Sequence, residues 1–280
     1  MLKTASLRPH QPCQTGAAGH LPAPKLPLLF FIVGSLLLSS CANMDDAPAQ
    51  GDEPFLNTVV SLTFDDGDAD NFAIRSALMD NDLRATWYIA SGLTGTPGYL
   101  TQDQLRTLRQ DGHEIGGHSL AHVNLTEVRG VELRRQVCQD RLNLLTWGFE
   151  PVSFAYPFGH YDQESARTVS ECGYNSARIV TGGPDTNPPA DALAVKAMPY
   201  IVSNVRLAKM QRYVTEVAAA GGGWVIFVFH HICEDCDQYS IDLETFTAFA
   251  DWLGDQQSHG LVVATIGDIV GGAVQPAVEP

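Results

Sequence analysis

The sequence predicts an α/β fold built on a parallel sheet, either a barrel or a doubly wound sheet. Short runs rich in Val, Ile and Phe alternate along the chain with longer segments of helical periodicity. Strands that alternate with helices pair in parallel through crossover connections. With 280 residues, 45% of them hydrophobic, the chain can bury one large core, and we expect one folded domain.

The predicted elements are six strands and five longer helices. The strands are Val59–Phe64, Ala85–Ala90, Glu114–Gly117, Val152–Tyr156, Val225–Phe229 and Leu261–Ala264. The helices are Gln102–Gln110, Glu127–Thr146, Gln163–Cys172, Leu207–Ala220 and Leu243–Leu253, with a short one after Ile266. We expect the domain to span residues 58–270 and residues 271–280 to form a frayed tail.

The first 41 residues have the pattern of an export signal. Lys25 precedes the apolar run Leu26–Leu38, which is shorter than the roughly 20 residues that span a bilayer. The run ends in Leu38-Ser39-Ser40-Cys41, which resembles a bacterial lipobox and predicts an exported lipoprotein, at the cell surface or in the periplasm, lipidated at Cys41. An ordinary secreted protein and an uncleaved anchor are the alternatives. Residues 42–57, rich in Asp, Ala, Pro and Gly, are expected to form a flexible tether.

The charge of the chain restricts its partners. A formal net charge of −15 repels polyanions such as nucleic acid and anionic membrane surfaces, whereas neutral or cationic glycans are not repelled. We therefore expect no nucleic-acid partner and membrane contact only through the N-terminal lipid. A monomer is expected.

Besides the two cysteines of the N-terminal segment, the chain contains four more. An even number in an exported chain suggests disulfides, with three possible pairings. We favour Cys138 with Cys172 and Cys233 with Cys236. The alternative is a four-cysteine zinc site, but only one Cys-x-x-Cys pair is present.

Polar residues gather where the predicted strands end. Asp65-Asp66 ends the first strand, His118 and His122 follow the third, Tyr156–Gly159 ends the next, and His230-His231 follows Phe229. In parallel α/β folds the reactive groups lie at the carboxyl ends of the strands. These residues are therefore the candidates for one site.

The residue types at these strand ends favour a metal centre. Two adjacent buried carboxylates are unfavourable unless a cation compensates them, although one of the pair can instead cap a helix near Ala69. Two histidines four residues apart lie on one side of a helical turn or tight loop, but such pairs are also found as ordinary structural histidines. Together with one aspartate they make a three-ligand site that leaves a position open for water, as catalytic zinc requires.

His230 ends an apolar strand and is a candidate general acid. A histidine that only binds a backbone carbonyl is the alternative. His231 is expected to point to the opposite side of the strand.

Taken together, these residues resemble the polysaccharide deacetylase family, also called carbohydrate esterase family 4 or the NodB-homology domain. The family's first motif is present unchanged at Thr63–Gly67 and its second, His-Ser/Thr-x-x-His, at His118–His122. The resemblance covers roughly Thr58–Ile269. It implies a distorted (β/α) barrel with about seven strands.

The resemblance also implies roles for the strand-end residues. Asp65 would be the general base, and Asp66, His118 and His122 would bind one divalent metal, zinc before cobalt or nickel. His230, in its charged form, would donate a proton to the leaving amine.

The third motif, at Ala155–Gly159, is expected to contribute to the substrate groove. Pro157 and Phe158 would shape its wall, Tyr156 would join them in binding the substrate or the oxyanion, and the Phe158 N–H would face the oxyanion. The fifth motif, an apolar residue followed by a strand-terminal histidine, fits Phe229-His230.

Two departures from the family pattern are visible. Ala155 stands where many members have an arginine that acts on the base, and Arg178 is a candidate substitute. The aspartate and tryptophan of the fourth motif are not found between Gly182 and Tyr200.

These implications predict a hydrolase that removes N-acetyl groups from a polymer containing N-acetylglucosamine and releases acetate. Chitin-like polymers, peptidoglycan and exopolysaccharides are candidate substrates. An O-acetyl xylan esterase with the same site and a non-catalytic glycan-binding lipoprotein are the alternatives.

Overall fold

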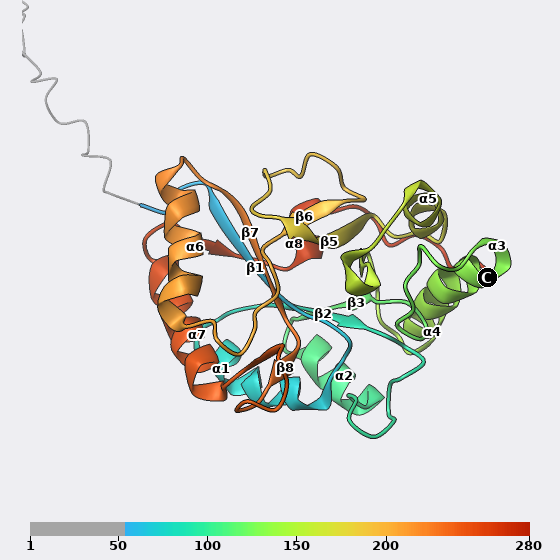
Figure 1. Cartoon of the computed structure of the whole chain (residues 1–280), viewed down its shortest axis with the longest axis horizontal. Helices are drawn as coiled ribbons and strands as arrows, with labels where there is room; N and C mark the ends of the chain where they lie inside the picture. The colour runs from blue at the N-terminus through green and yellow to red at the C-terminus, as the bar shows by residue number, and fades with distance from the viewer. Residues whose placement is uncertain (1–53) are drawn as a thin grey trace, which may run out of the picture. The chain divides into compact units, whose positions relative to one another are not determined.

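The computed structural model describes residues 54–280, which form an α/β barrel flanked by helices (Figure 1). The predicted signal segment 1–41 with Cys41 and most of the predicted tether lie outside the described residues. Within residues 54–280 no helix has both the length and the apolar character needed to cross a bilayer.

Eight parallel strands form the main sheet of the described part of the chain. They are β1 (Thr58–Phe64), β2 (Thr86–Ile89), β3 (Glu114–Gly117), β4 (Ser153–Ala155), β5 (Ser176–Gly182), β6 (Val195–Ala197), β7 (Gly223–Phe229) and β10 (Val262–Val263). Their order is β7-β1-β2-β3-β4-β5-β6, with β10 beside the first half of β1. Two short strands, β8 (His231–Ile232) and β9 (Ser240–Ile241), pair separately.

The barrel closes between β6 and β7. After β6, the N–H groups of Met198 and Ile201 donate to the carbonyls of Ile226 and Val228 at 2.9 and 3.0 Å. Seven strands therefore surround one interior. The predicted distorted (β/α) barrel of about seven strands is confirmed.

The helices agree with the periodic segments except near residue 137. They are η1 (Ala69–Ile74), α1 (Arg75–Asp80), α2 (Gln102–Gln110), α3 (Gly130–Arg134), α4 (Asp140–Thr146), η3 (Pro157–Gly159), α5 (Gln163–Glu171), α6 (Leu207–Ala219), α7 (Leu243–Gln257) and α8 (Ile266–Val270). The single helix predicted over 127–146 is present from Gly130 to Thr146, but it contains one π-helical turn, η2 (Arg135–Gln139), between α3 and α4.

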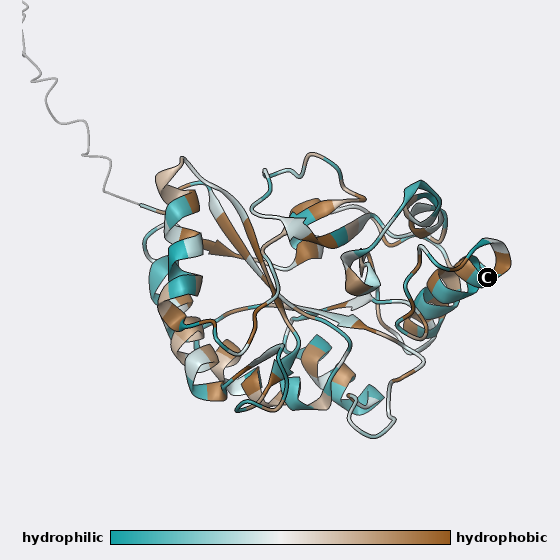
Figure 2. Cartoon of the chain, in the orientation of Figure 1, coloured by the Kyte–Doolittle hydropathy of each residue, from teal (hydrophilic) through white to brown (hydrophobic). Residues whose placement is uncertain are grey.

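Alternate residues of β7 face opposite sides of the barrel wall. One set joins the large core beneath the helices, namely Val225, Phe227 and Phe229. The other set joins the cluster inside the barrel, namely Trp224, Ile226 and Val228. Figure 2 shows brown segments along β1 and β7, whereas α6 is largely teal. The same alternation, continued past the strand, directs His230 inward and His231 outward.

The folded part begins earlier and ends later than predicted. Phe55 is buried against Trp252, with ring centroids 6.1 Å apart, so the tether prediction is wrong for the segment around Phe55. At the other end, Arg141 donates to the carbonyls of Gln275 and Pro276 at 2.7 and 3.0 Å. The predicted tail is thus held against the domain rather than frayed.

His113 is expected to make stability depend on pH. Its ring packs 4.6 Å from that of Trp87 and accepts the Ala85 N–H, and burial lowers its pKa to about 4. Because the unfolded chain binds a proton near pH 6.5 and the folded chain does not, stability is full above pH 6.5 and is lost as the pH falls toward 4. Between pH 7 and 5 the loss should be about 2 kcal/mol. Urea unfolding of wild type and His113→Gln at both pH values checks this, and an equal loss in both proteins would contradict it.

Candidate active site

Asp66, His118 and His122 converge at the carboxyl ends of β1 and β3. The Nε2 atoms of His118 and His122 lie 3.2 and 3.0 Å from the same oxygen, Asp66 Oδ1. One ligand atom from each residue lies within 4.8 Å of the others. Asp66 Oδ1 is buried and has no hydrogen-bond partner among residues 54–280. Three donors that face one another without hydrogen-bonding geometry fit a shared metal ion.

The backbone is strained around these donors. Asp66, Ser119, His122 and Phe158 have positive φ angles of 68, 66, 51 and 60°, in the left-handed region that non-glycine residues rarely adopt. Such conformations cost about 1–3 kcal/mol each and collect at functional sites. The strain turns Asp66 toward the histidines after β1 ends.

A backbone carbonyl fixes the tautomer of His118. Its Nδ1 lies 2.7 Å from the carbonyl oxygen of Ala155, which can only accept. In the neutral ring, which a metal requires, the proton therefore resides on Nδ1, and the lone pair of Nε2 is directed at Asp66. A histidine held in this way is oriented as a metal ligand.

Asp66 is kept ionised by its neighbours. Burial alone would raise the pKa of this carboxyl, but without a metal the adjacent His118 and His122 imidazoles, in their protonated forms, more than offset burial and hold the pKa well below its usual range. The charged form that a metal requires is therefore the stable one.

Asp65 forms a buried ion pair with Arg178. Position 65 continues the inward-facing set of β1, and the Arg178 Nη2 donates to both carboxylate oxygens. The side chains of Arg178 and Asp65 are 0% and 2% exposed. The guanidinium also lies 5.1 Å from the centre of the Tyr88 ring. A full positive charge thus compensates Asp65 inside the barrel.

Arg178 stands beside the position where many family members have arginine. Ala155 and Arg178 are register partners on β4 and β5, and the small Ala155 side chain is buried inside the barrel. The guanidinium therefore reaches Asp65 from the neighbouring strand. This geometry supports Arg178 as the substitute that the sequence suggested.

His230 and His231 face opposite sides, as predicted. The His230 ring lies 5.0 Å from that of Tyr200 and 5.4 Å from that of Tyr239. Its Nδ1 is buried without a partner among the described residues. Burial lowers the pKa of His230, against the opposing effect of Asp65. The free protein thus favours neutral His230, and the charged form is expected only at the step in which His230 donates a proton.

His231 belongs to the outer side of the rim. Its Nδ1 lies 2.9 Å from an oxygen of Asp70, and the other Asp70 oxygen accepts the Ile232 N–H at 3.3 Å. These contacts link β8 to η1. His231 thus supports the rim rather than facing the candidate metal centre.

The groove prediction holds for Phe158 but not for Tyr156. Phe158 is 48% exposed, with its ring 4.6 Å from that of His122, and Pro157 beside it is buried. The Tyr156 side chain is buried and its hydroxyl donates to the Leu193 carbonyl at 3.0 Å. The prediction that Tyr156 lines the groove is therefore wrong, because its ring packs in the wall behind. The exposed ring of Tyr161, which sequence analysis missed, stacks on it at 5.2 Å.

The predicted disulfides are both present. Cys138 is bonded to Cys172 and Cys233 to Cys236, with Cα–Cα distances of 4.9 and 5.9 Å. Asp70 lies close to Cys233 and Cys236, but the two cysteine sulfurs are already bonded to each other. The alternative of a four-cysteine zinc site is wrong.

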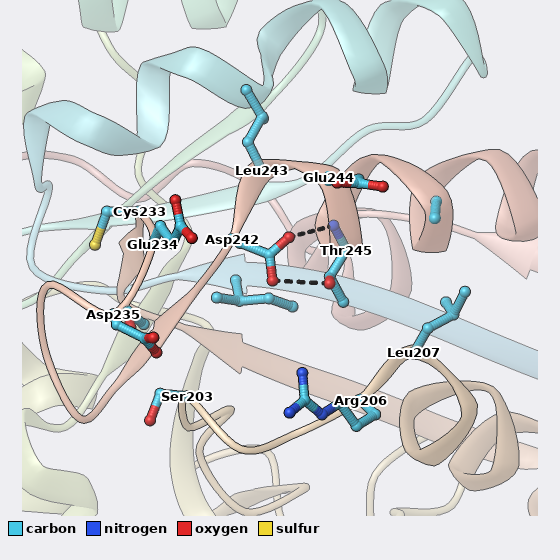
Figure 3. Close-up of a pocket in the computed structure, with 13 residues that line it drawn as sticks. Ser203, Arg206, Leu207, Cys233, Glu234, Asp235, Asp242, Leu243, Glu244 and Thr245 are labelled. Atoms are coloured by element: carbon cyan, nitrogen blue, oxygen red, sulfur yellow. Dashed lines mark hydrogen bonds between the residues drawn. The ribbon is translucent and has the colours of Figure 1, made fainter.

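A cavity of about 760 Å³ lies near this second disulfide, lined by residues from the starts of α6 and α7 (Figure 3). Its polar lining includes Arg206, Glu234 and Asp242. The Asp242 carboxylate caps α7 by accepting from the N–H and hydroxyl of Thr245 at 2.7 and 2.8 Å. None of the candidate metal ligands lines this cavity, so the site at the strand ends is separate from it.

Comparison with known proteins agrees with this geometry. Residues 52–177 match the family described as polysaccharide deacetylase. A peptidoglycan-N-acetylglucosamine deacetylase of Bacillus cereus is 29% identical over 122 residues, 42% of this chain and 42% of the relative. A chitin deacetylase of Colletotrichum lindemuthianum is 27% identical over 123 residues, 42% of this chain and 48% of the relative.

The fold is also that of solved deacetylase structures. A family 4 carbohydrate esterase from Streptomyces lividans, in complex with acetate, aligns with a TM-score of 0.53 at 20% identity, over 79% of this chain and 99% of that one. The curated relatives are matched over about half of their length or less. Residues 52–177 thus carry the sequence of the polysaccharide deacetylase family, and the barrel that contains them has the fold of solved members.

Proposed function

We propose that this protein is a metal-dependent deacetylase that removes N-acetyl groups from a polysaccharide containing N-acetylglucosamine. The observation that carries the proposal is the convergence of three groups at one end of the barrel: the Asp66–His118–His122 donors, the Asp65–Arg178 pair and His230. Together they provide a ligand set, a base and an acid for acyl hydrolysis.

Asp66, His118 and His122 would hold the metal. Two imidazoles and one carboxylate suit zinc, and they also accept cobalt or nickel. Bound there, a divalent metal supplies Lewis acidity to an acyl carbonyl and to water.

Asp65 would take the proton of the attacking water. Its ion pair with Arg178 orients the carboxylate and keeps a compensating charge beside it. The Phe158 N–H would donate to the developing oxyanion, a contact worth about 2.7–4 kcal/mol in comparable sites. His230 would then protonate the leaving amine, after gaining a proton that the free protein does not hold at neutral pH.

Acetate release tests the proposal. The domain would be assayed on N-acetylated chito-oligosaccharides and on acetylated xylan, each with chelator and with zinc added back. Metal-dependent release from the first substrate is expected. Release from xylan alone would make the protein an O-acetyl esterase, and release from neither, nor from peptidoglycan, despite bound metal would favour a glycan-binding protein.

Substitution of the two neighbouring histidines should separate their roles. His230→Gln is expected to lower kcat by about 10²–10⁴-fold, because it removes the proton donor. His231→Gln keeps a polar group that can still bond Asp70, and it lies on the outer side, away from the reacting groups, so it should change kcat less than about threefold. Steady-state kinetics of both variants measure this, and equal losses would contradict the assignment.

We also propose that the protein is exported and anchored outside the cytoplasm through Cys41, and that it is a monomer. Radiolabelled fatty acid should be incorporated into the full chain and not into Cys41→Ala. Labelling of both, or of neither, would contradict the anchor. Elution of the soluble domain as a dimer would contradict the monomer.

A further inference from the structure

A buried turn lies directly behind the loop of His118 and His122. The π-turn η2 (Arg135–Gln139) separates α3 from α4, and π-turns within helices are rare and frequently lie at functional sites. Gln136 in this turn and Asp140 just after it are 1% and 0% exposed. Neither is among the residues predicted from the sequence.

Gln136 and Asp140 accept hydrogen bonds from three backbone N–H groups of the loop His118–His122. The Leu120 N–H donates to the Gln136 carbonyl at 2.8 Å, and the Ala121 N–H to the Gln136 Oε1 at 3.0 Å. The His118 N–H is shared between Asp140 Oδ2 at 3.1 Å and a β2 carbonyl at 3.0 Å. The loop is therefore anchored at its first, third and fourth residues.

The anchoring matters because the loop is strained. Ser119 and His122 both have positive φ angles, 66 and 51°. Such conformations persist only where surrounding contacts determine them. Without the bonds from η2 and Asp140, we expect the loop to relax and carry the His122 imidazole away from Asp66.

Asp140 is itself fixed on several sides. Its Oδ1 accepts the Ser91 N–H at 3.0 Å and its Oδ2 accepts the Tyr174 hydroxyl at 3.3 Å. Gly117 leaves room for this contact, since a Cβ there would collide with the Tyr174 hydroxyl. The Cys138–Cys172 disulfide joins the chain two residues before Asp140 and two residues before Tyr174. The Asp140 carboxylate thus connects the backbone of His118 to Ser91 and to Tyr174.

From this arrangement we propose that Asp140 and Gln136 are positioning residues that set the affinity and geometry of metal binding at Asp66, His118 and His122, although neither contacts the metal. The inference rests on the proposed function, because it assumes that these three residues bind a metal. It adds a second set of residues, on η2 and α4, on which that site depends.

Asp140→Asn tests this by replacing one acceptor oxygen with an amide NH₂ of the same size. Whichever way the amide turns, either the His118 N–H or the Ser91 N–H then faces the NH₂ group, which cannot accept. Loss of a partner behind a metal ligand typically weakens affinity about 10- to 100-fold, and we expect that loss for Co²⁺ in chelator competition, with an altered Co²⁺ absorption spectrum.

Glu114→Gln is the matched control. Glu114 is a half-buried carboxylate on β3, and it accepts from Thr86, Ser153 and Gly267 at the other end of the strand. This variant should lose stability and yet bind Co²⁺ with the wild-type affinity and spectrum.

The outcomes are distinguishable. Wild-type affinity and spectrum in Asp140→Asn would overturn the positioning role and leave the proposed function intact. Wild-type protein that binds neither Co²⁺ nor Zn²⁺ would overturn both. If Asp140→Asn does not fold, Gln136→Met carries the same test, because it removes the acceptor of the Ala121 N–H together with the donor to Glu132 and leaves the Gln136 carbonyl in place. Weakened binding would support the proposal, and unchanged binding would overturn it.

Discussion

Asp65→Asn is expected to bind metal as the wild type does and to lose turnover by about 10²–10⁴-fold. Asparagine keeps the shape of the side chain and an oxygen that can accept from Arg178, but it cannot take a proton from water. The metal donors Asp66, His118 and His122 are unchanged. Zinc content after dialysis and kcat for acetate release measure the two effects separately.

Asp66→Ala is the matched comparison, one residue away. It removes the carboxylate that both imidazoles face at 3.2 and 3.0 Å, so it should lose metal and turnover together. If Asp65→Asn kept the wild-type rate, Asp65 would not be the base. If Asp66→Ala retained stoichiometric zinc, the ligand set would be wrong.

The motifs of the site could be predicted because each follows a strand directly. Asp65, His118 and His230 are within one or two residues of the ends of β1, β3 and β7, so identifying the strand also locates the residue. Inward and outward directions followed from the period of two along β7. The sequence therefore predicted which of the two histidines faces inward.

Other parts of the site depend on contacts between distant segments. Arg178 lies within β5, and a charged residue at the centre of a strand weakens the apolar pattern by which strands are recognised. Its partner Asp65 is 113 positions away, and only the β4–β5 register shows that it lies beside Ala155. Arg178 was a candidate from the sequence, but its strand β5 was not predicted. The π-helical turn η2 was also missed, because the periodicity of residues 127–146 continues through it.

Tyr156 shows the limit of reasoning from a motif. The backbone of the third motif is where the resemblance implied, with Phe158 exposed beside His122. The direction of the Tyr156 ring depends on the cluster formed by Phe154 and Tyr174 behind β4. No local pattern indicates that cluster, since its members come from separate strands and helices.

Arg178→Met is expected to lower the free energy of unfolding by about 3–5 kcal/mol. The substitution leaves the Asp65 carboxylate buried, at 2% exposure, without the cation that compensates it. Removing one partner of a buried ion pair costs more than replacing both. Urea unfolding of the metal-free protein measures the loss without a contribution from metal binding.

The double variant Asp65→Asn/Arg178→Met decides what the ion pair contributes. If the two charges stabilise each other, the double variant should lose less than the sum of the single variants, by about 0.5–3 kcal/mol. Strictly additive losses would mean that Arg178 acts through the Tyr88 ring and packing alone, and it would then have no role in orienting the base. Coupling in stability together with a low kcat in Arg178→Met would instead show that the Arg178 guanidinium supports the base Asp65. That support would then come from β5, rather than from an arginine at position 155 on the neighbouring strand β4.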